Sequence, residues 1–163
     1  MKILLLIVAS LVVSAVVLLF VLALVSRSGD LPGLVDGHLP ACPNRPNCVC
    51  SECPADPDHL VEPLPLPHGV VDLESRIGMT LTRMGGEVRI ERDNYVAATF
   101  SSPLFGFVDD FQVRVDPEGR QIHLRSASRV GYSDGGVNRK RATRFRAQWQ
   151  ALLATTESSG NYQ

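Results

Sequence analysis

The stretch FGFVDDFQVRVDPEGRQIHLRSAS, residues 105–128, decides the fold that we predict for this chain. Polar and apolar residues alternate on both sides of a central DPEG, a composition typical of a β-turn. The stretch therefore predicts two antiparallel strands joined by a tight hairpin. A symmetric turn places Asp109 opposite Ser126 and Asp110 opposite Arg125.

The same alternation separates the two faces of the hairpin. Phe107, Asp109, Phe111, Val113 and Val115 share one side, which is apolar except for the carboxylate of Asp109. Because an unpaired buried charge costs several kcal/mol, Asp109 must find hydrogen-bond donors.

The neighbouring carboxylate belongs to the other side of the hairpin. There we expect Asp110 to form a cross-strand ion pair with Arg125. A β-bulge would shift the register by one residue and exchange the roles of Asp109 and Asp110.

Two interpretations of Asp109 remain open. In the structural one, it fixes the last helix to the end of the sheet through hydrogen bonds, which is the commoner role of a buried polar group. In the functional one, it belongs to a small polar pocket. The residues of that candidate pocket are Asp109, Ser126, Ser128, Arg129, Tyr132, Asp134 and Asn138.

The flanking sequence completes the predicted domain. A helix begins after Asp72 and ends at Gly85-Gly86, and a second hairpin turns at Asp93-Asn94. Asn138 is the predicted cap of a last helix. We therefore predict an α+β fold, a four-stranded antiparallel meander with a helix before and after it, both packed on one face.

The N-terminal segment is long and apolar. Residues Ile3 to Val25 contain no charge, and as a helix they span about 34 Å against a hydrocarbon core of about 30 Å. A cleaved signal peptide is the alternative, but its apolar region is usually about 7–15 residues and ends at a small-x-small site. The following SRSGD offers no such site, so we predict a retained transmembrane helix.

The compartment is inferred from the cysteines. Lys2 and Arg27 flank the apolar segment and give no bias, whereas four cysteines within residues 42–53 suit an oxidising compartment. We predict a single-pass protein of the inner (cytoplasmic) membrane with an extracytoplasmic, periplasmic C-terminal domain. The predicted segments are an anchor at 1–27, a linker at 28–41, a domain with an N-terminal cysteine-rich strap at 42–154, and a disordered tail at 155–163.

The four cysteines allow three kinds of site. A zinc knuckle needs a second C-x-x-C pair, and a thioredoxin-type site needs Cys50 at a helix N-terminus. Structural disulfides remain, and of three possible pairings we favour Cys42–Cys48 with Cys50–Cys53. No metal and no other cofactor is expected.

The basic run NRKRATRFR, residues 138–146, does not indicate a nucleic-acid-binding protein. Helix phase turns Phe145 and Trp149 toward the core and leaves most of the arginines on the solvated face. Phospholipid headgroups are a better match than nucleic acid for these charges, and an ordinary solvated helix face is favoured over either. The expected partners are the lipid bilayer, through residues 3–25, and a small ligand or an envelope protein.

Several motifs together resemble a known family. CPNRPNCVCS, LFGFVDD and RSASRVGYSDGGVNRKR are similar to the uncharacterised bacterial family catalogued as domain of unknown function 1499, over roughly residues 42–150. The family has no assigned activity, so the resemblance implies no reaction. It implies a Cys42–Cys48 pairing and typically has a serine where this chain has Cys50. The matching motif residues are Asn47, His59, Asp109, Asp110, Arg125, Ser126, Ser128, Arg129, Tyr132, Ser133, Asp134, Asn138 and Arg139.

The function that we predict from these features is a non-catalytic binding or scaffolding module on a membrane anchor. The first alternative is a small hydrolase-like enzyme with His59 or Asp109 as base and Ser126 or Ser128 as nucleophile, although no G-x-S-x-G motif is present. The second is a thiol redox or metal-binding protein that uses Cys50 and Cys53.

Overall fold

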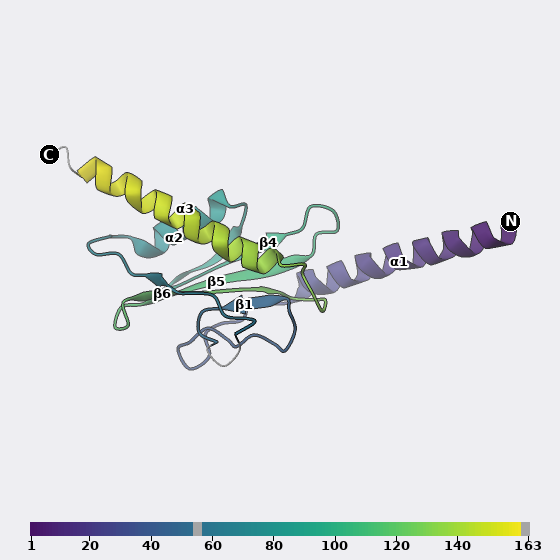
Figure 1. Cartoon of the computed structure of the whole chain (residues 1–163), viewed down its shortest axis with the longest axis horizontal. Helices are drawn as coiled ribbons and strands as arrows, with labels where there is room; N and C mark the ends of the chain where they lie inside the picture. Colours follow the sequence, from purple (N-terminus) through teal and green to yellow (C-terminus); the bar gives the residue numbers. More distant parts are fainter. Residues whose placement is uncertain (54–56, 161–163) are drawn as a thin grey trace.

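The computed structural model describes residues 1–53 and 57–155 with their side chains, and residues 156–160 as backbone. Figure 1 shows the elements in chain order. They are α1 (Lys2–Ser28), β1 (Cys48–Cys50), β2 (Leu64–Pro65), α2 (Leu73–Arg83), β3 (Glu87–Arg92), β4 (Tyr95–Ser101), β5 (Val108–Asp116), β6 (Gln121–Ser128) and α3 (Val137–Gly160). Helix α3 therefore extends into the segment for which the sequence predicts a disordered tail, and residues 161–163 of that tail lie outside the described residues.

The sheet confirms the predicted α+β class and adds two strands to it. β3 to β6 form the expected antiparallel meander, and the strand order is β1-β6-β5-β4-β3. β1 and β2 both pair with β6, antiparallel to it. The sequence does not show these strands, because segments of three and two residues are too short to display an alternating pattern.

The register between β5 and β6 differs from the predicted one. Asp109 lies opposite Ser128, and Asp110 lies opposite Ala127. The turn is one residue further along than a symmetric DPEG turn, because Arg120 adopts a left-handed conformation with φ 55°. Each residue consequently meets a partner two positions beyond the predicted one, so the register was wrong but every side chain stays on its predicted face.

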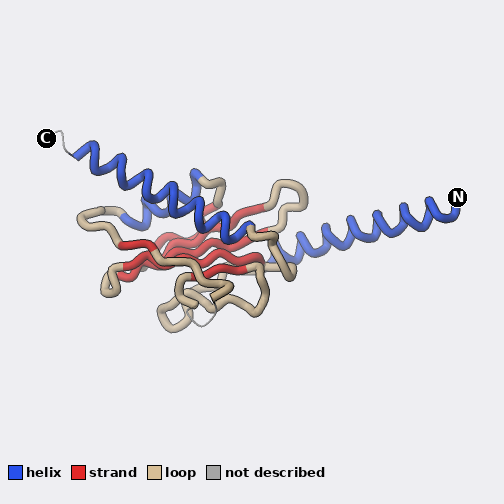
Figure 2. Tube along the Cα trace, viewed as in Figure 1, coloured by secondary structure: helices blue, strands red, loops and turns tan. Residues whose placement is uncertain are grey.

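The main core lies between the sheet and both helices, which cover the same face (Figure 2). Ile77 of α2 and Phe145 of α3 are fully buried there against Phe111 of β5. The centroids of the Phe111 and Phe145 rings are 5.3 Å apart. Helix α2 ends where Gly85 adopts a φ of +89°, which confirms the predicted stop at the glycine pair.

The opposite face of the sheet is covered by the segment before β1. Leu39 packs there with Tyr95 and Ala97 of β4. The hydroxyl of Tyr95 and the side-chain amide of Gln112 both donate to the carbonyl oxygen of Pro32, over 2.8 and 2.7 Å. Residues 28–41, for which the sequence predicts a linker, therefore pack on the sheet.

Helix α1 is long and apolar enough to cross a membrane. It projects from one end of the domain, and the C-terminus lies at the opposite end (Figure 1). Its last turns are in contact with the domain, since Ala23 and Ser26 are buried. The Ser26 hydroxyl accepts a hydrogen bond of 3.1 Å from the backbone N–H of Val108, at the start of β5. The helix thus joins the domain through a packed contact.

Candidate functional site

The predicted polar residues gather mainly around Asn138, in the first turn of α3. Its side-chain oxygen accepts hydrogen bonds from Ser126 (2.5 Å) and Arg141 (2.7 Å). Its side-chain nitrogen donates to the carbonyl oxygen of Asn47 and to the hydroxyl of Ser128, both over 2.9 Å. Asn138 is only 1% exposed, so this network joins α3, β6 and the segment before β1 from within the core.

Asp109 has a partner that the sequence did not indicate. Its carboxylate accepts a hydrogen bond of 2.8 Å from Arg141, and the two side chains are 15% and 13% exposed. The Arg141 guanidinium also lies 4.7 Å from the centre of the Phe100 ring. The sequence indicated that Asp109 needs hydrogen-bond donors, but it did not identify this arginine as one of them. The available signal was position, because Arg141 follows Asn138 by three residues and shares its helix face.

The cap of α3 also differs from the predicted one. The carboxylate of Asp134 accepts hydrogen bonds from the backbone N–H groups of Gly136 (2.8 Å) and Asn138 (2.7 Å). Asp134 therefore caps the helix, and Asn138 is free to use its side chain in the core. Tyr132, another predicted pocket residue, is exposed.

The predicted ion pair of Asp110 has a different partner in the structure. Asp110 pairs with Arg129, whose Nε and Nη2 lie 2.9 and 2.8 Å from its Oδ1. The predicted Asp110–Arg125 pair is wrong, because the register brings Ala127 opposite Asp110 and Arg125 donates instead to Gln112, over 2.8 Å. Burial raises the pKa of Asp110, although Arg129 and Arg125 oppose the shift.

Arg129 also connects this pair to α1, on the opposite side of the sheet from Asn138. Its Nη1 donates to the carbonyl oxygen of Ser26 over 3.2 Å and to that of Gly29. The structure therefore separates Arg129 from the other predicted pocket residues and gives it a role at the junction between α1 and the sheet.

A hollow of about 470 Å³ lies beside the Asp109–Arg141 pair. We call it the anchor hollow, because Leu19 and Leu22 of α1 form part of its wall. The remaining apolar wall comes from the loop before β5, the loop before α3 and the start of α3, and it includes Phe107, Val130 and Val137. Of the polar residues that line it, Asp109, Ser128 and Arg141 are hydrogen-bonded to one another or to Asn138.

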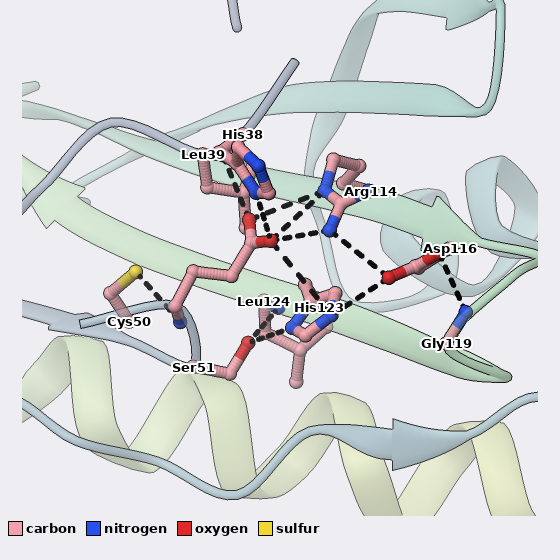
Figure 3. Close-up of polar contacts among 10 residues, drawn as sticks. His38, Leu39, Cys50, Ser51, Arg114, Asp116, Gly119, His123 and Leu124 are labelled. Carbon is pink, nitrogen blue, oxygen red and sulfur yellow. Dashed lines mark hydrogen bonds and ion pairs between the residues drawn. The ribbon is translucent and has the colours of Figure 1, made fainter. Parts of the chain in front are cut away.

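A second polar cluster, on the opposite face of the sheet, was missed by the sequence reasoning (Figure 3). Its centre is Glu52, whose side chain is 8% exposed. The carboxylate accepts hydrogen bonds from Arg114, from the backbone N–H of Leu39 (2.8 Å) and from His38 (3.1 Å). The Nε2 atom of His123 lies 3.8 Å from the Oε1 atom of the Glu52 carboxylate.

The electrostatics of the Glu52 cluster indicate a structural role. Burial alone would raise the pKa of Glu52, but its bonds to Arg114, Leu39 and His38 outweigh burial and lower it. Burial lowers the pKa of His123, so the neutral imidazole is favoured. Among the described residues no group of His, Cys, Asp or Glu is arranged to hold a metal ion. The cluster instead holds the segment around Glu52 against β5 and β6.

The cysteines form one disulfide. The bond between Cys42 and Cys48 is present, with 5.6 Å between the Cα atoms, which confirms that pairing. Cys50 and Cys53 are free thiols, so the predicted Cys50–Cys53 disulfide is absent from the structure. Cys50 is held in β1, and its sulfur accepts a hydrogen bond from the backbone N–H of Glu52 (3.3 Å). Burial, with a smaller contribution from the neighbouring Cys53, raises the pKa of the Cys50 thiol to about 12.

The residues proposed for hydrolysis have other partners. Ser126 is fully buried and donates its hydroxyl proton to the side-chain oxygen of Asn138. His59 is hydrogen-bonded through Nε2 to the carbonyl oxygen of Arg45 over 2.8 Å. The serine hydroxyl therefore gives its proton to an amide, whereas an activated nucleophile gives it to a base.

Comparison with known families gives one match. The model of a family described as "Protein of unknown function (DUF1499)" matches residues 38–149. This range holds the disulfide, the Glu52 cluster, the whole sheet and α3 as far as Trp149. No curated protein matches the chain.

Proposed function

The chain belongs to the DUF1499 family, and we propose that it is a membrane-anchored, extracytoplasmic module that binds the apolar chain of an amphiphile without catalysis. The observation that carries this proposal is the anchor hollow. Its apolar wall is shared between the domain and the helix that would enter the bilayer.

Retention of α1 as an anchor is supported by its contacts with the domain. The helix contains 27 residues, about 40 Å of length, which exceeds the hydrocarbon core of about 30 Å. Cleavage as a signal peptide would remove the Ser26 hydroxyl that accepts from Val108, and one of the carbonyl oxygens that bind Arg129. The fold therefore uses the residues that a signal peptidase would discard.

An extracytoplasmic position is supported by the Cys42–Cys48 disulfide. Structural disulfides persist in oxidising compartments and are rare in the cytosol. We therefore place α1 in the inner membrane and the domain on its outer side.

The anchor hollow has the size and lining of a site for an apolar chain. Its volume, about 470 Å³, falls within the range of about 300–1,000 Å³ that is usual for ligand pockets. Leu22, Phe107 and Val137 offer apolar contact to a chain, and each methylene moved out of water contributes about 0.8 kcal/mol. The Asp109–Arg141 pair beside it is internally neutral, and the Asp134 carboxylate in its wall is bonded to the backbone N–H groups of Gly136 and Asn138.

The polar groups at the hollow support binding over catalysis. Ser128 accepts from Asn138, and Asp109 is paired with Arg141. A catalytic carboxylate or hydroxyl needs a free lone pair or a mobile proton at the reacting atom. Here the nearest candidates are used to hold α3 against β5 and β6.

Photolabelling tests this proposal with the full chain in phosphatidylcholine vesicles. The probe is a phosphatidylcholine that carries a photoactivatable diazirine on one acyl chain, and labelled tryptic peptides are identified by mass spectrometry. We expect label on peptide 130–139, which forms part of the hollow wall and is released by cleavage after Arg129 and Arg139.

Two tryptophan substitutions, one in the hollow and one outside it, give the control. Val137→Trp fills the hollow and should abolish labelling of the peptide 130–139, whereas Met79→Trp, on the exposed side of α2, should leave it unchanged. Label confined to α1, or labelling that Val137→Trp does not reduce, would refute the proposed site.

A further inference from the structure

The loop between β4 and β5 carries an unusually exposed apolar residue. Leu104 is 80% exposed, the highest value for a large apolar side chain among the described residues that follow α1. Phe105 follows it in the same loop. Single exposed apolar residues are normal on protein surfaces, so the meaning of Leu104 depends on what lies beside it.

The loop is fixed to the end of α1. Arg27 donates to the carbonyl oxygens of Phe105 (2.6 Å) and Gly106 (3.1 Å). The ring of Phe105 meets the ring of Phe20 edge-on, with 5.6 Å between their centres. Gly106 has a φ of +71°, and a Cβ atom there would collide with the Arg27 guanidinium, so this close approach requires glycine.

These contacts place the loop tip at a definite level along α1. Phe20 precedes Ser26 by six residues, about 9 Å along a helix axis. The polar interfacial layer on each side of a bilayer is about 5–7 Å thick. If the charged Arg27 lies among the headgroups, the level of Phe20 and Phe105 falls inside the hydrocarbon region.

The base of the loop also satisfies its own backbone groups, as a segment in contact with lipid must. The backbone N–H of Ser102 donates to the carbonyl oxygen of Phe107 over 2.8 Å, and the N–H of Gly106 donates to the carbonyl oxygen of Ser102 over 3.0 Å. The Ser102 hydroxyl accepts from the N–H of Phe107 over 3.0 Å. Arg27 binds two more carbonyl oxygens, so these backbone groups at the base of the loop have partners within the protein.

We infer that residues 102–107 form a second membrane contact, which inserts Leu104 and Phe105 into the outer leaflet beside α1. The domain then rests on the bilayer in one orientation, fixed by two attachments on the same end of the sheet. This inference rests on the membrane-anchored position proposed above, but it does not depend on a ligand in the anchor hollow.

A tryptophan at the loop tip tests the contact in the full chain. Leu104→Trp is reconstituted in vesicles of phosphatidylcholine brominated on the acyl chains, because bromine quenches tryptophan fluorescence at short range. The matched control is Val71→Trp, since Val71 is 67% exposed. Val71 also lines a hollow with Arg120, at the other end of β5 and β6. The native Trp149 is buried and common to both variants.

We expect the emission added by Leu104→Trp, measured as the difference from the parent chain, to shift to shorter wavelength and to lose most of its intensity in brominated vesicles, while the emission added by Val71→Trp keeps its intensity. Flotation of the vesicles separates the two proposals. If both variants float and are quenched equally, the loop contact is refuted and the anchor stands. If neither floats, the anchor fails and the loop contact fails with it.

Discussion

Substitution of Arg141 by methionine should strongly destabilise the domain, because this guanidinium holds the polar end of the core together. Arg141 neutralises Asp109, donates to the side-chain oxygen of Asn138 and lies over the ring of Phe100. Methionine keeps much of the aliphatic bulk and removes these polar contacts. The variant leaves the Asp109 carboxylate, 15% exposed, without its charged partner.

The magnitude follows from the exposure of the pair. Breaking a buried ion pair by removal of one partner costs about 3–5 kcal/mol, and loss of a hydrogen bond to a buried amide costs about 1 kcal/mol. Residual water access to both side chains reduces the first figure. We expect a loss of about 3 kcal/mol in the free energy of unfolding. This is a large part of the total stability of a domain, which is usually about 5–15 kcal/mol.

The assay is guanidinium unfolding of the full chain in detergent, followed by the fluorescence of Trp149, the single and fully buried tryptophan. Arg144→Met is the matched control, because Arg144 lies on the same helix and is exposed. It should change the free energy of unfolding by less than about 0.5 kcal/mol. In the double variant that combines Arg141→Met with Asp109→Asn, the loss in the free energy of unfolding should be smaller than the sum of the losses in the two single variants. Equal midpoints for the Arg141 and Arg144 variants would refute the reasoning.

Two further predictions concern the other face of the sheet. Glu52 has a lowered pKa because its bonds to Arg114, Leu39 and His38 outweigh burial. Its stabilising effect is therefore complete above the unfolded-state pKa of about 4.3 and is lost as the pH falls through the folded-state pKa. Unfolding midpoints from neutral to acid pH should fall less steeply in Glu52→Gln than in the parent chain, and parallel curves would contradict this. Iodoacetamide should modify Cys53 well before Cys50, whose buried thiol has a pKa of about 12. Peptide mass spectrometry measures both rates of modification. A chain that yields no free thiol after unfolding would contradict this prediction and show that the two cysteines had formed a disulfide.

The faces of the sheet could be predicted from the sequence, whereas the residue partners could not. Alternation from Phe107 to Val115 is a local signal that turns successive side chains to opposite sides, and the burial of Phe111 and Val113 agrees with it. The partner of each residue depends on the centre of the turn. That centre moved because Arg120 adopts a positive φ, which the DPEGR sequence does not reveal.

The candidate site was predicted in part for a related reason. The parity of the strands and the position of α3 brought Asp109, Ser128 and Asn138 to one end of the sheet. The missing residue was Arg141, since helix phase alone assigned most arginines of α3 to the solvated face. Glu52 could not be found at all, because its bond to Arg114 joins residues 62 positions apart and the strap around it has no periodic pattern.

The packed junction between α1 and β5 has a mechanical consequence in the anchored protein that we propose. A hydrophobic helix longer than the local hydrocarbon thickness accommodates by tilting. With Ser26 bonded to Val108 and Arg27 bonded to the neighbouring loop, α1 has no hinge at its exit. In a thinner bilayer the sheet would therefore tilt together with the helix. Lipid composition would then set the distance of the C-terminal end of α3 from the membrane.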